Sequence, residues 1–191
     1  MDIPFLSDGT SFIAMILVAT SYFVKNKKGY LLFQFLGIIF LILSYFFSLE
    51  FVAMIGLTIG LFRTLTYFLY EKKDKPAPLY WPFIFSAFTI ASYFIGNELK
   101  GTEGSLLDVL CVTSLCMYAF IFRVRDFRIV KFTCLVPTAM SITYNALIGV
   151  TFNAISYLFE FCANILAIIL YYKNFNKEKI LAFNKGGKES E

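Results

Sequence analysis

Residues 30–49 read YLLFQFLGIIFLILSYFFSL, and this stretch contains no charged side chain. A helix of about 20 apolar residues is long enough to cross the roughly 30 Å hydrocarbon core of a bilayer. The stretch does not alternate between apolar and polar residues, and it is about twice as long as a barrel strand. Because lipid offers no partners to backbone N–H and C=O groups, we expect a membrane-spanning helix here.

Six further apolar segments lie on both sides of this stretch, separated by charged or Gly- and Pro-rich breaks. They are residues 10–24, 51–70, 79–96, 106–122, 132–150 and 152–172. No Lys or Arg precedes Lys25, so the basic region of a signal peptide is missing and the first segment is expected to remain as a helix. The sequence therefore predicts an all-α membrane protein, a bundle of seven transmembrane helices.

The composition agrees with this fold class. Of the 191 residues, 59% are hydrophobic and 16% are charged, whereas soluble domains are about 45–50% apolar and about a quarter charged. Such a chain is not disordered, not a disulfide-built secreted domain and not a nucleic-acid-binding module. The expected partners are the lipid bilayer and a small solute, and association with further copies of the chain is left open.

Basic residues predict the orientation. Fifteen of the 17 Lys and Arg residues fall on one side of the predicted membrane. They are Lys25, Lys27, Lys28, Lys72, Lys73, Lys75, Arg123, Arg125, Arg128, Lys131, Lys173, Lys177, Lys179, Lys185 and Lys188. Because cytoplasmic loops carry an excess of Lys and Arg, we expect the N-terminus outside and the C-terminus in the cytoplasm.

Weak similarities between the two halves suggest an internal repeat. Ser44-Tyr45 matches Thr143-Tyr144 at an offset of 99 residues, and Leu69-Tyr70 resembles Leu170-Tyr171 at an offset of 101. The alternative is coincidence among helices rich in Tyr and Leu. A repeat gives two parallel three-helix units joined by a linking helix: residues 1–72, the linker and its loops 73–104, residues 105–173, and a cytoplasmic tail 174–191.

Two ionisable residues inside the segments are the main candidates for a site, because charges within a bilayer are costly. Arg63 and Glu160 differ in depth by about four residues, or about 6 Å along the helix axis, so they would form an ion pair if their helices face each other. The pair could bind substrate or protons, or it could fix helix register. A third alternative is that Arg63 extends toward the cytoplasmic interface.

Other polar and special residues complete the candidate set. Asn164, Tyr157, Asn153 and Gln34 would line a polar pocket with Arg63 and Glu160, although each alone is more often a contact between helices. At the offset of 101, Asn164 is the counterpart of Arg63.

Glycine and proline within the segments predict packing and bending. Gly56 and Gly60 form a Gly-x-x-x-Gly pattern that favours close helix packing. Pro137 is expected to kink its helix, either as a gating point or as a shape determinant.

Several activities are excluded by missing residues. The chain contains no His, which removes His-based metal sites, haem ligation and His general-base catalysis. Its four Cys lack the paired spacing of a metal site, and no Gly-x-x-x-x-Gly-Lys-Ser/Thr loop for ATP is present. We therefore expect no cofactor, no metal and no enzymatic activity.

A family resemblance rests on Leu61-Phe62-Arg63-Thr64-Leu65-Thr66, which follows the Gly-x-x-x-Gly pattern, together with Tyr144-Asn145, Glu160 and Asn164. With these residues the chain resembles the YgjV family of small bacterial inner-membrane proteins over about residues 10–173. The layout is similar to the SWEET/PQ-loop architecture, which implies a bacterial inner-membrane location and a transport role. The first and fifth segments lack the proline of SWEET-type helices, and no Pro-Gln pair occurs.

These observations leave two functional hypotheses. The first is a facilitator or secondary carrier of a small polar metabolite, such as a sugar, nucleoside or vitamin, through a pocket between the two units. The alternative is a non-transporting assembly partner or sensor whose buried polar residues only hold helices together.

Overall fold

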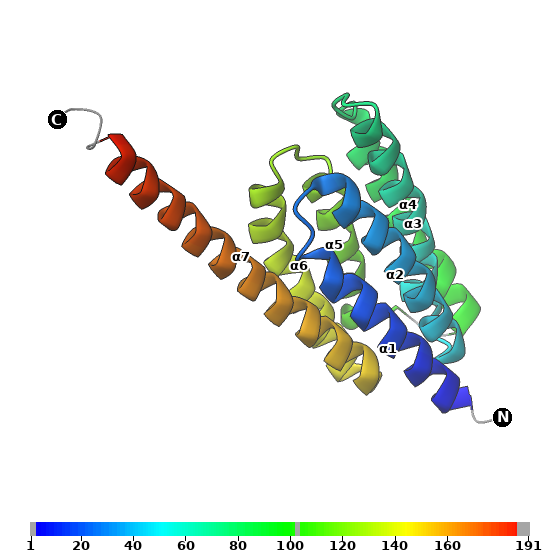
Figure 1. The fold of residues 1–191 in the computed structure, drawn as a ribbon. Helices are drawn as coiled ribbons and strands as arrows, with labels where there is room; N and C mark the ends of the chain where they lie inside the picture. The colour runs from blue at the N-terminus through cyan, green and yellow to red at the C-terminus, as the bar shows by residue number, and fades with distance from the viewer. Residues whose placement is uncertain (1–2, 102–103, 187–191) are drawn as a thin grey trace.

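The chain folds into seven helices (Figure 1). The computed structural model describes residues 3–101 and 104–186, and side chains within residues 5–101 and 104–173. No strand occurs in this part of the chain. The helices are α1 (Ile3–Ser21), α2 (Lys27–Phe47), α3 (Phe51–Lys72), α4 (Tyr80–Lys100), α5 (Leu106–Ile121), α6 (Phe127–Leu147) and α7 (Thr151–Gly186). The predicted all-α, seven-helix bundle is confirmed.

Several helices extend beyond the predicted segments. At α2, which begins at Lys27 rather than at residue 30, and at α6 and α7, the reason is that the helix includes basic residues. Helix α6 begins at Phe127 rather than at residue 132, so Arg128 and Lys131 belong to its first turns. Helix α7 continues to Gly186, and Figure 1 shows its C-terminal part running out beyond the other helices. The predicted tail, residues 174–191, therefore begins as a continuation of α7; its side chains and residues 187–191 lie outside the described part.

The helices differ in how well they match a membrane span. By length and apolar composition, three described segments are able to cross a membrane: Lys27–Phe47, Phe51–Lys72 and Thr151–Lys173. Phe5–Ser21 and Leu106–Ile121 are apolar but shorter. Seven spans therefore remain a prediction.

Six helices form a closed circle, and the seventh covers one side of it. The circle runs α1, α2, α3, α5, α6, α7 and back to α1, each helix packing against the next, while α4 packs on α3 and α5. The circle has two joins between the N-terminal and C-terminal halves of the chain. These are the contact of α3 with α5, which α4 covers, and the contact of α7 with α1.

Large apolar side chains point outward from this circle. Phe62, Phe88 and Phe159 are more than half exposed, whereas Ser44, Asn145 and Asn153 are fully buried. Large exposed apolar side chains together with fully buried polar ones fit a hydrocarbon environment, where polar residues face the bundle interior.

The same turn connects α2 to α3 and α6 to α7. Leu49 and Gly149 both adopt a left-handed conformation, with φ of 57° and 81°. The N–H of the next residue, Glu50 or Val150, donates to the carbonyl five residues back at 3.0 Å in both turns. This is the hydrogen bond of a Schellman C-cap, for which glycine is the favoured residue. The helices on either side of these turns start 100 residues apart.

Replacing Gly149 by alanine is expected to destabilise the protein. A side chain at a left-handed position costs about 1–2 kcal/mol, so the free energy of unfolding of Gly149→Ala falls by about that amount. Unfolding by SDS titration in mixed micelles measures it.

Gly9→Ala is the matched control. Gly9 lies in helix α1 and no neighbour stands within 4 Å of an added Cβ. This variant is expected to gain up to about 1 kcal/mol, because alanine has the higher helix propensity. Equal effects of the two substitutions would contradict the special role of the turn.

Candidate functional site

Glu160 on α7 is buried among polar groups from other helices. Its side chain is 5% exposed, and the Tyr22 hydroxyl, from the turn after α1, donates to Glu160 Oε1 at 2.6 Å. Thr138 on α6 is a second polar neighbour of this carboxyl group. The carboxyl group is thus positioned where α1, α6 and α7 meet.

A hydroxyl chain leads from this position to α5. The Tyr118 hydroxyl bonds to the Thr138 hydroxyl at 2.8 Å, and the Thr138 hydroxyl lies 2.7 Å from the carbonyl of Cys134. Glu160 also lines a cavity of only about 10 Å³, together with Tyr157 and Ser156. A space of this size accommodates about one water molecule.

The side chain of Arg63 on α3 binds to helix α5 and to the residue that follows it. Its Nη1 donates to the carbonyl of Leu115 at 2.7 Å. Its guanidinium carbon lies 5.8 Å from the ring centroid of Tyr118 and 5.3 Å from that of Phe122, distances at which an arginine is attracted to an aromatic face. Its Nε is buried without a hydrogen-bond partner. One turn further along α3, the Tyr67 hydroxyl donates to the carbonyl of Ala119 at 2.7 Å.

The ion pair considered between Arg63 and Glu160 does not form, since the described salt bridges include neither residue. The physical reason is the helix order: α3 packs against α2, α4 and α5, whereas α7 packs against α1 and α6. Extension of Arg63 to the interface is also wrong, because its side chain is 2% exposed. Arg63 instead lies at the α3–α5 join and Glu160 at the α7–α1 join. Between them, Arg63 contacts the ring of Tyr118, and the Tyr118 hydroxyl bonds to Thr138, the neighbour of Glu160.

The other predicted binding residues lie at separate places. Asn153 Oδ1 accepts hydrogen bonds from the hydroxyls of Ser11 and, at 3.1 Å, Ser44. Gln34 Nε2 donates to Ser21 Oγ at 3.1 Å. Asn164 Nδ2 donates to the carbonyl of Lys131 at 2.7 Å. Asn153, Gln34 and Asn164 therefore connect helices, whereas Tyr157 shares the small cavity with Glu160.

Two of these amides keep unused hydrogen-bonding capacity. Asn153 Nδ2 and Asn164 Oδ1 are buried without a partner. With helix starts spaced by 100 residues, the position equivalent to Asn164 is Thr64 rather than Arg63, and the position equivalent to Glu160 is Gly60. The predicted correspondence of Asn164 with Arg63 is therefore displaced by one residue.

The residues singled out for packing and gating occupy buried positions. A Cβ on Gly56 would lie 2.5 Å from Leu115 Cδ1, so the missing side chain lets α3 approach α5. A Cβ on Gly60 would lie 3.2 Å from Nη2 of Arg63, so this glycine makes room for the guanidinium. Pro137 lies inside α6 and is buried, and its gating role remains a prediction.

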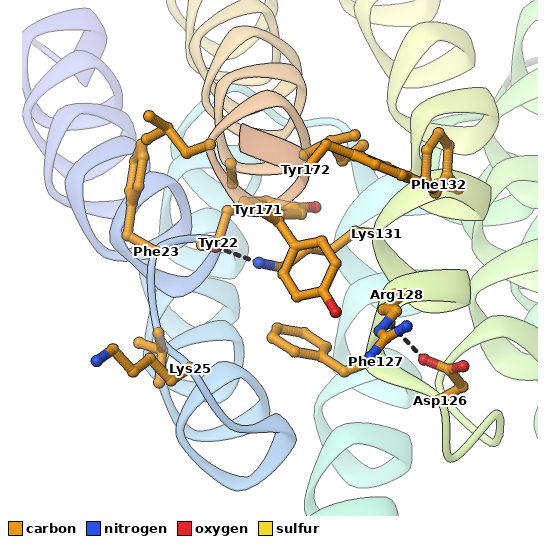
Figure 2. A pocket seen from close by; sticks show the side chains of 14 residues that line it. Tyr22, Phe23, Lys25, Asp126, Phe127, Arg128, Lys131, Phe132, Tyr171 and Tyr172 are labelled. Atoms are coloured by element: carbon orange, nitrogen blue, oxygen red, sulfur yellow. Dashed lines mark hydrogen bonds between the residues drawn. The ribbon is translucent and has the colours of Figure 1, made fainter. Parts of the chain in front are cut away.

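The structure contains two features that the sequence analysis did not predict, a cluster of serines and a large pocket. Ser7 bonds to Ser44 and Ser48 across α1 and α2; the four-residue spacing of Ser44 and Ser48 was a usable signal. The pocket has a volume of about 660 Å³. Its walls come from the end of α1, the following loop, the start of α6 and the last part of α7 that carries described side chains (Figure 2).

Tyr22 connects this pocket to Glu160. It lines the pocket, and its hydroxyl bonds to the carboxyl group behind it. Among the described residues, no group of three or more His, Cys, Asp and Glu side chains is arranged to hold a metal ion.

An apolar surface, buried polar side chains and seven helices together define a helical membrane protein. A family model described as Imp-YgjV, bacterial inner membrane protein, matches residues 5–177, and the chain belongs to this family. The resemblance noted from the sequence is thereby confirmed. No curated protein and no solved structure matches the chain at a significant level.

The join between α3 and α5 yields a prediction. Tyr67→Phe removes one buried hydrogen bond to the backbone of α5, and the free energy of unfolding should fall by about 0.5–1.5 kcal/mol. Tyr172→Phe is the control, because Tyr172 is 51% exposed. SDS titration of both variants gives the comparison; a Tyr67→Phe protein as stable as the control would show that this bond does not hold the join.

Proposed function

We propose that this inner-membrane protein is a facilitator or secondary carrier of a small polar solute, such as a sugar, nucleoside or vitamin, and not an enzyme. The observation that carries the proposal is the position of Glu160. A carboxyl group deep in a membrane protein is costly and is characteristic of a solute or proton pathway. Here it lies between a water-sized cavity and Tyr22, the wall of a much larger pocket.

The proposed architecture is two three-helix units, residues 1–72 and 105–173, joined by a linker centred on α4. Helix contacts within the circle support it: exchanging α1, α2 and α3 with α5, α6 and α7 reproduces the same neighbouring pairs among these six helices, whereas α4 packs on the α3–α5 join. The repeated turn at Leu49 and Gly149 supports it too. Substrate sites of repeat-built transporters lie at the interface between repeats, and Glu160 lies at such an interface, next to α1.

The proposed orientation places the N-terminus outside and the C-terminus in the cytoplasm. It is supported by basic residues at the ends of the helices that meet at the pocket, including Lys25, Arg128 and Lys131. The large pocket would then open on the cytoplasmic side, and solute would pass from it toward Glu160.

Different roles follow for the six candidate residues. Glu160 would bind solute or a proton, with Tyr157 beside it. Arg63 would act as a positioning residue, because it holds the ring of Tyr118, whose hydroxyl bonds to Thr138.

The amide side chains have a second proposed role. Asn153, Asn164 and Gln34 connect helices. Of these, Asn153 and Asn164 also keep a free polar atom for a solute.

The test begins with a thermal-shift screen of the purified protein against sugars, nucleosides and vitamins, because a ligand that binds only the folded state raises the unfolding temperature. Uptake of a stabilising compound into proteoliposomes is then compared between the wild type and Glu160→Gln. The amide keeps the shape and the bond from Tyr22 but loses the charge. Uptake should fall at least about tenfold, a loss of ~1.4 kcal/mol.

Two further variants make the result specific. Glu98→Gln changes an exposed acid on α4 and should leave uptake unchanged. Arg63→Ala should lower uptake because Tyr118 loses its support. The carrier proposal would be overturned if Glu160→Gln took up solute as fast as the wild type, or if no compound in the screen raised the unfolding temperature.

The alternative, a non-transporting assembly partner or sensor, is favoured by one observation. The cavity beside Glu160 has room for about one water molecule, too small for a sugar or a nucleoside. Under this alternative, Glu160→Gln lowers the free energy of unfolding, and no solute crosses the proteoliposome membrane with any variant.

A further inference from the structure

The 660 Å³ pocket combines aromatic walls with positive charge. Its volume lies within the range of ligand pockets, about 300–1,000 Å³. Three basic residues and one acid line it: Lys25, Arg128, Lys131 and Asp126. Six aromatic side chains surround them: Tyr22, Phe23, Phe127, Phe132, Tyr171 and Tyr172. The excess of positive charge favours an anionic occupant.

Lys131 is the charged group in the wall of this pocket. Figure 2 shows its amine between Tyr22, Phe127 and Tyr171. Nζ donates to the carbonyl of Tyr22 at 2.8 Å and lies 4.5 Å from the ring centroid of Phe127. Within residues 5–101 and 104–173, no carboxylate forms a salt bridge with it. Because an ammonium group has three donors, two remain for a ligand.

The single acid in the pocket is already engaged. Asp126 is the N-cap of α6, and its Oδ1 accepts a hydrogen bond from the backbone N–H of Arg128 at 2.9 Å. Its carboxylate thus serves the helix end and does not neutralise Lys131. An anion that enters the pocket would stabilise the half-buried ammonium group of Lys131, since an uncompensated charge near hydrocarbon is unfavourable.

The apolar part of the pocket wall favours an anion that also carries an apolar group. Ile168 and Leu170 on α7 and Phe132 on α6 line the pocket, and Phe132 and Leu170 also belong to the exposed apolar surface. An ion as small as phosphate would leave most of the volume empty. A molecule with an apolar part attached to its anionic group fills both regions.

We propose that this pocket binds a phosphate ester, with its anionic group on Lys131 and its apolar part against the aromatic and aliphatic walls. Two sources carry this chemistry: an anionic phospholipid that enters from the bilayer, and a soluble phosphorylated compound that enters from the aqueous side. Basic pockets between membrane helices are known to hold lipid head groups. In the proposed pathway this pocket precedes Glu160, and Tyr22 lies between the two; ligand binding at Lys131 is measured independently of the uptake assay that tests the carrier.

The experiment uses the full-length protein in dodecyl maltoside micelles, which contain no phosphate. Phosphatidylglycerol, phenyl phosphate and inorganic phosphate are added separately, and the unfolding temperature is followed by circular dichroism. We expect phosphatidylglycerol or phenyl phosphate to raise it in a saturable way, and inorganic phosphate to do so only at much higher concentration. Native mass spectrometry counts bound lipid. A response to phosphatidylglycerol alone identifies a lipid site, and a response to phenyl phosphate alone identifies a soluble ligand.

Variants make the site specific. Lys131→Gln should weaken binding at least tenfold, Lys131→Arg should retain it, and Lys73→Gln, an exposed charge at the end of α3, should behave as wild type. Because Lys131 also bonds to the backbone of Tyr22, Ile168→Trp provides a second route: it fills the pocket and leaves every charge in place. Binding that survives both Lys131→Gln and Ile168→Trp, or no stabilisation by any phosphate ester, would overturn the proposal.

Discussion

A polar group surrounded by hydrocarbon has no water to bond with, and the rest of this structure depends on that constraint. Backbone groups are satisfied within helices, so every regular element in the described part of the chain is a helix. Many buried serines, asparagines and tyrosines bond to one another or to backbone carbonyls of neighbouring helices. The hydrogen bonds from Ser11 to Asn153, from Tyr22 to Glu160 and from Arg63 to Leu115 all join different helices. Polar side chains therefore add contacts between helices to those of the two buried apolar clusters.

The sequence predicted the helices well because the signal is simple. A run such as residues 30–49 has one stable conformation in lipid. The ends were harder to predict: Arg128 and Lys131 looked like a loop, although a helix readily carries basic residues at a membrane interface, where their long stems reach the polar region. The same reasoning missed the continuation of α7 beyond residue 172.

The site was predicted only in part. Arg63 and Glu160 were conspicuous because ionisable residues are rare in such segments, and both are indeed buried. Their partners were not predictable, because depth along a helix says nothing about which helices are neighbours. Tyr22 was one of 12 tyrosines with no distinguishing pattern. The 660 Å³ pocket was out of reach for the same reason, since its walls come from three separate segments, within residues 22–25, 126–132 and 167–172.

The two joins of the helix circle are built differently. Arg63 and Tyr67 fasten α3 directly to backbone carbonyls of α5, and α4 lies across both helices. Between α1 and α7 two bonds join side chains, Ser11 to Asn153 and Tyr22 to Glu160, and the Ser156 hydroxyl donates to the carbonyl of Ser11 at 3.2 Å; no further described helix covers this join. Parts of a protein with fewer buried contacts open at lower free energy than the rest. The α1–α7 join, which no other described helix bridges, is therefore where we expect the circle to open first, and a molecule that enters between the two halves of the chain there would meet Glu160.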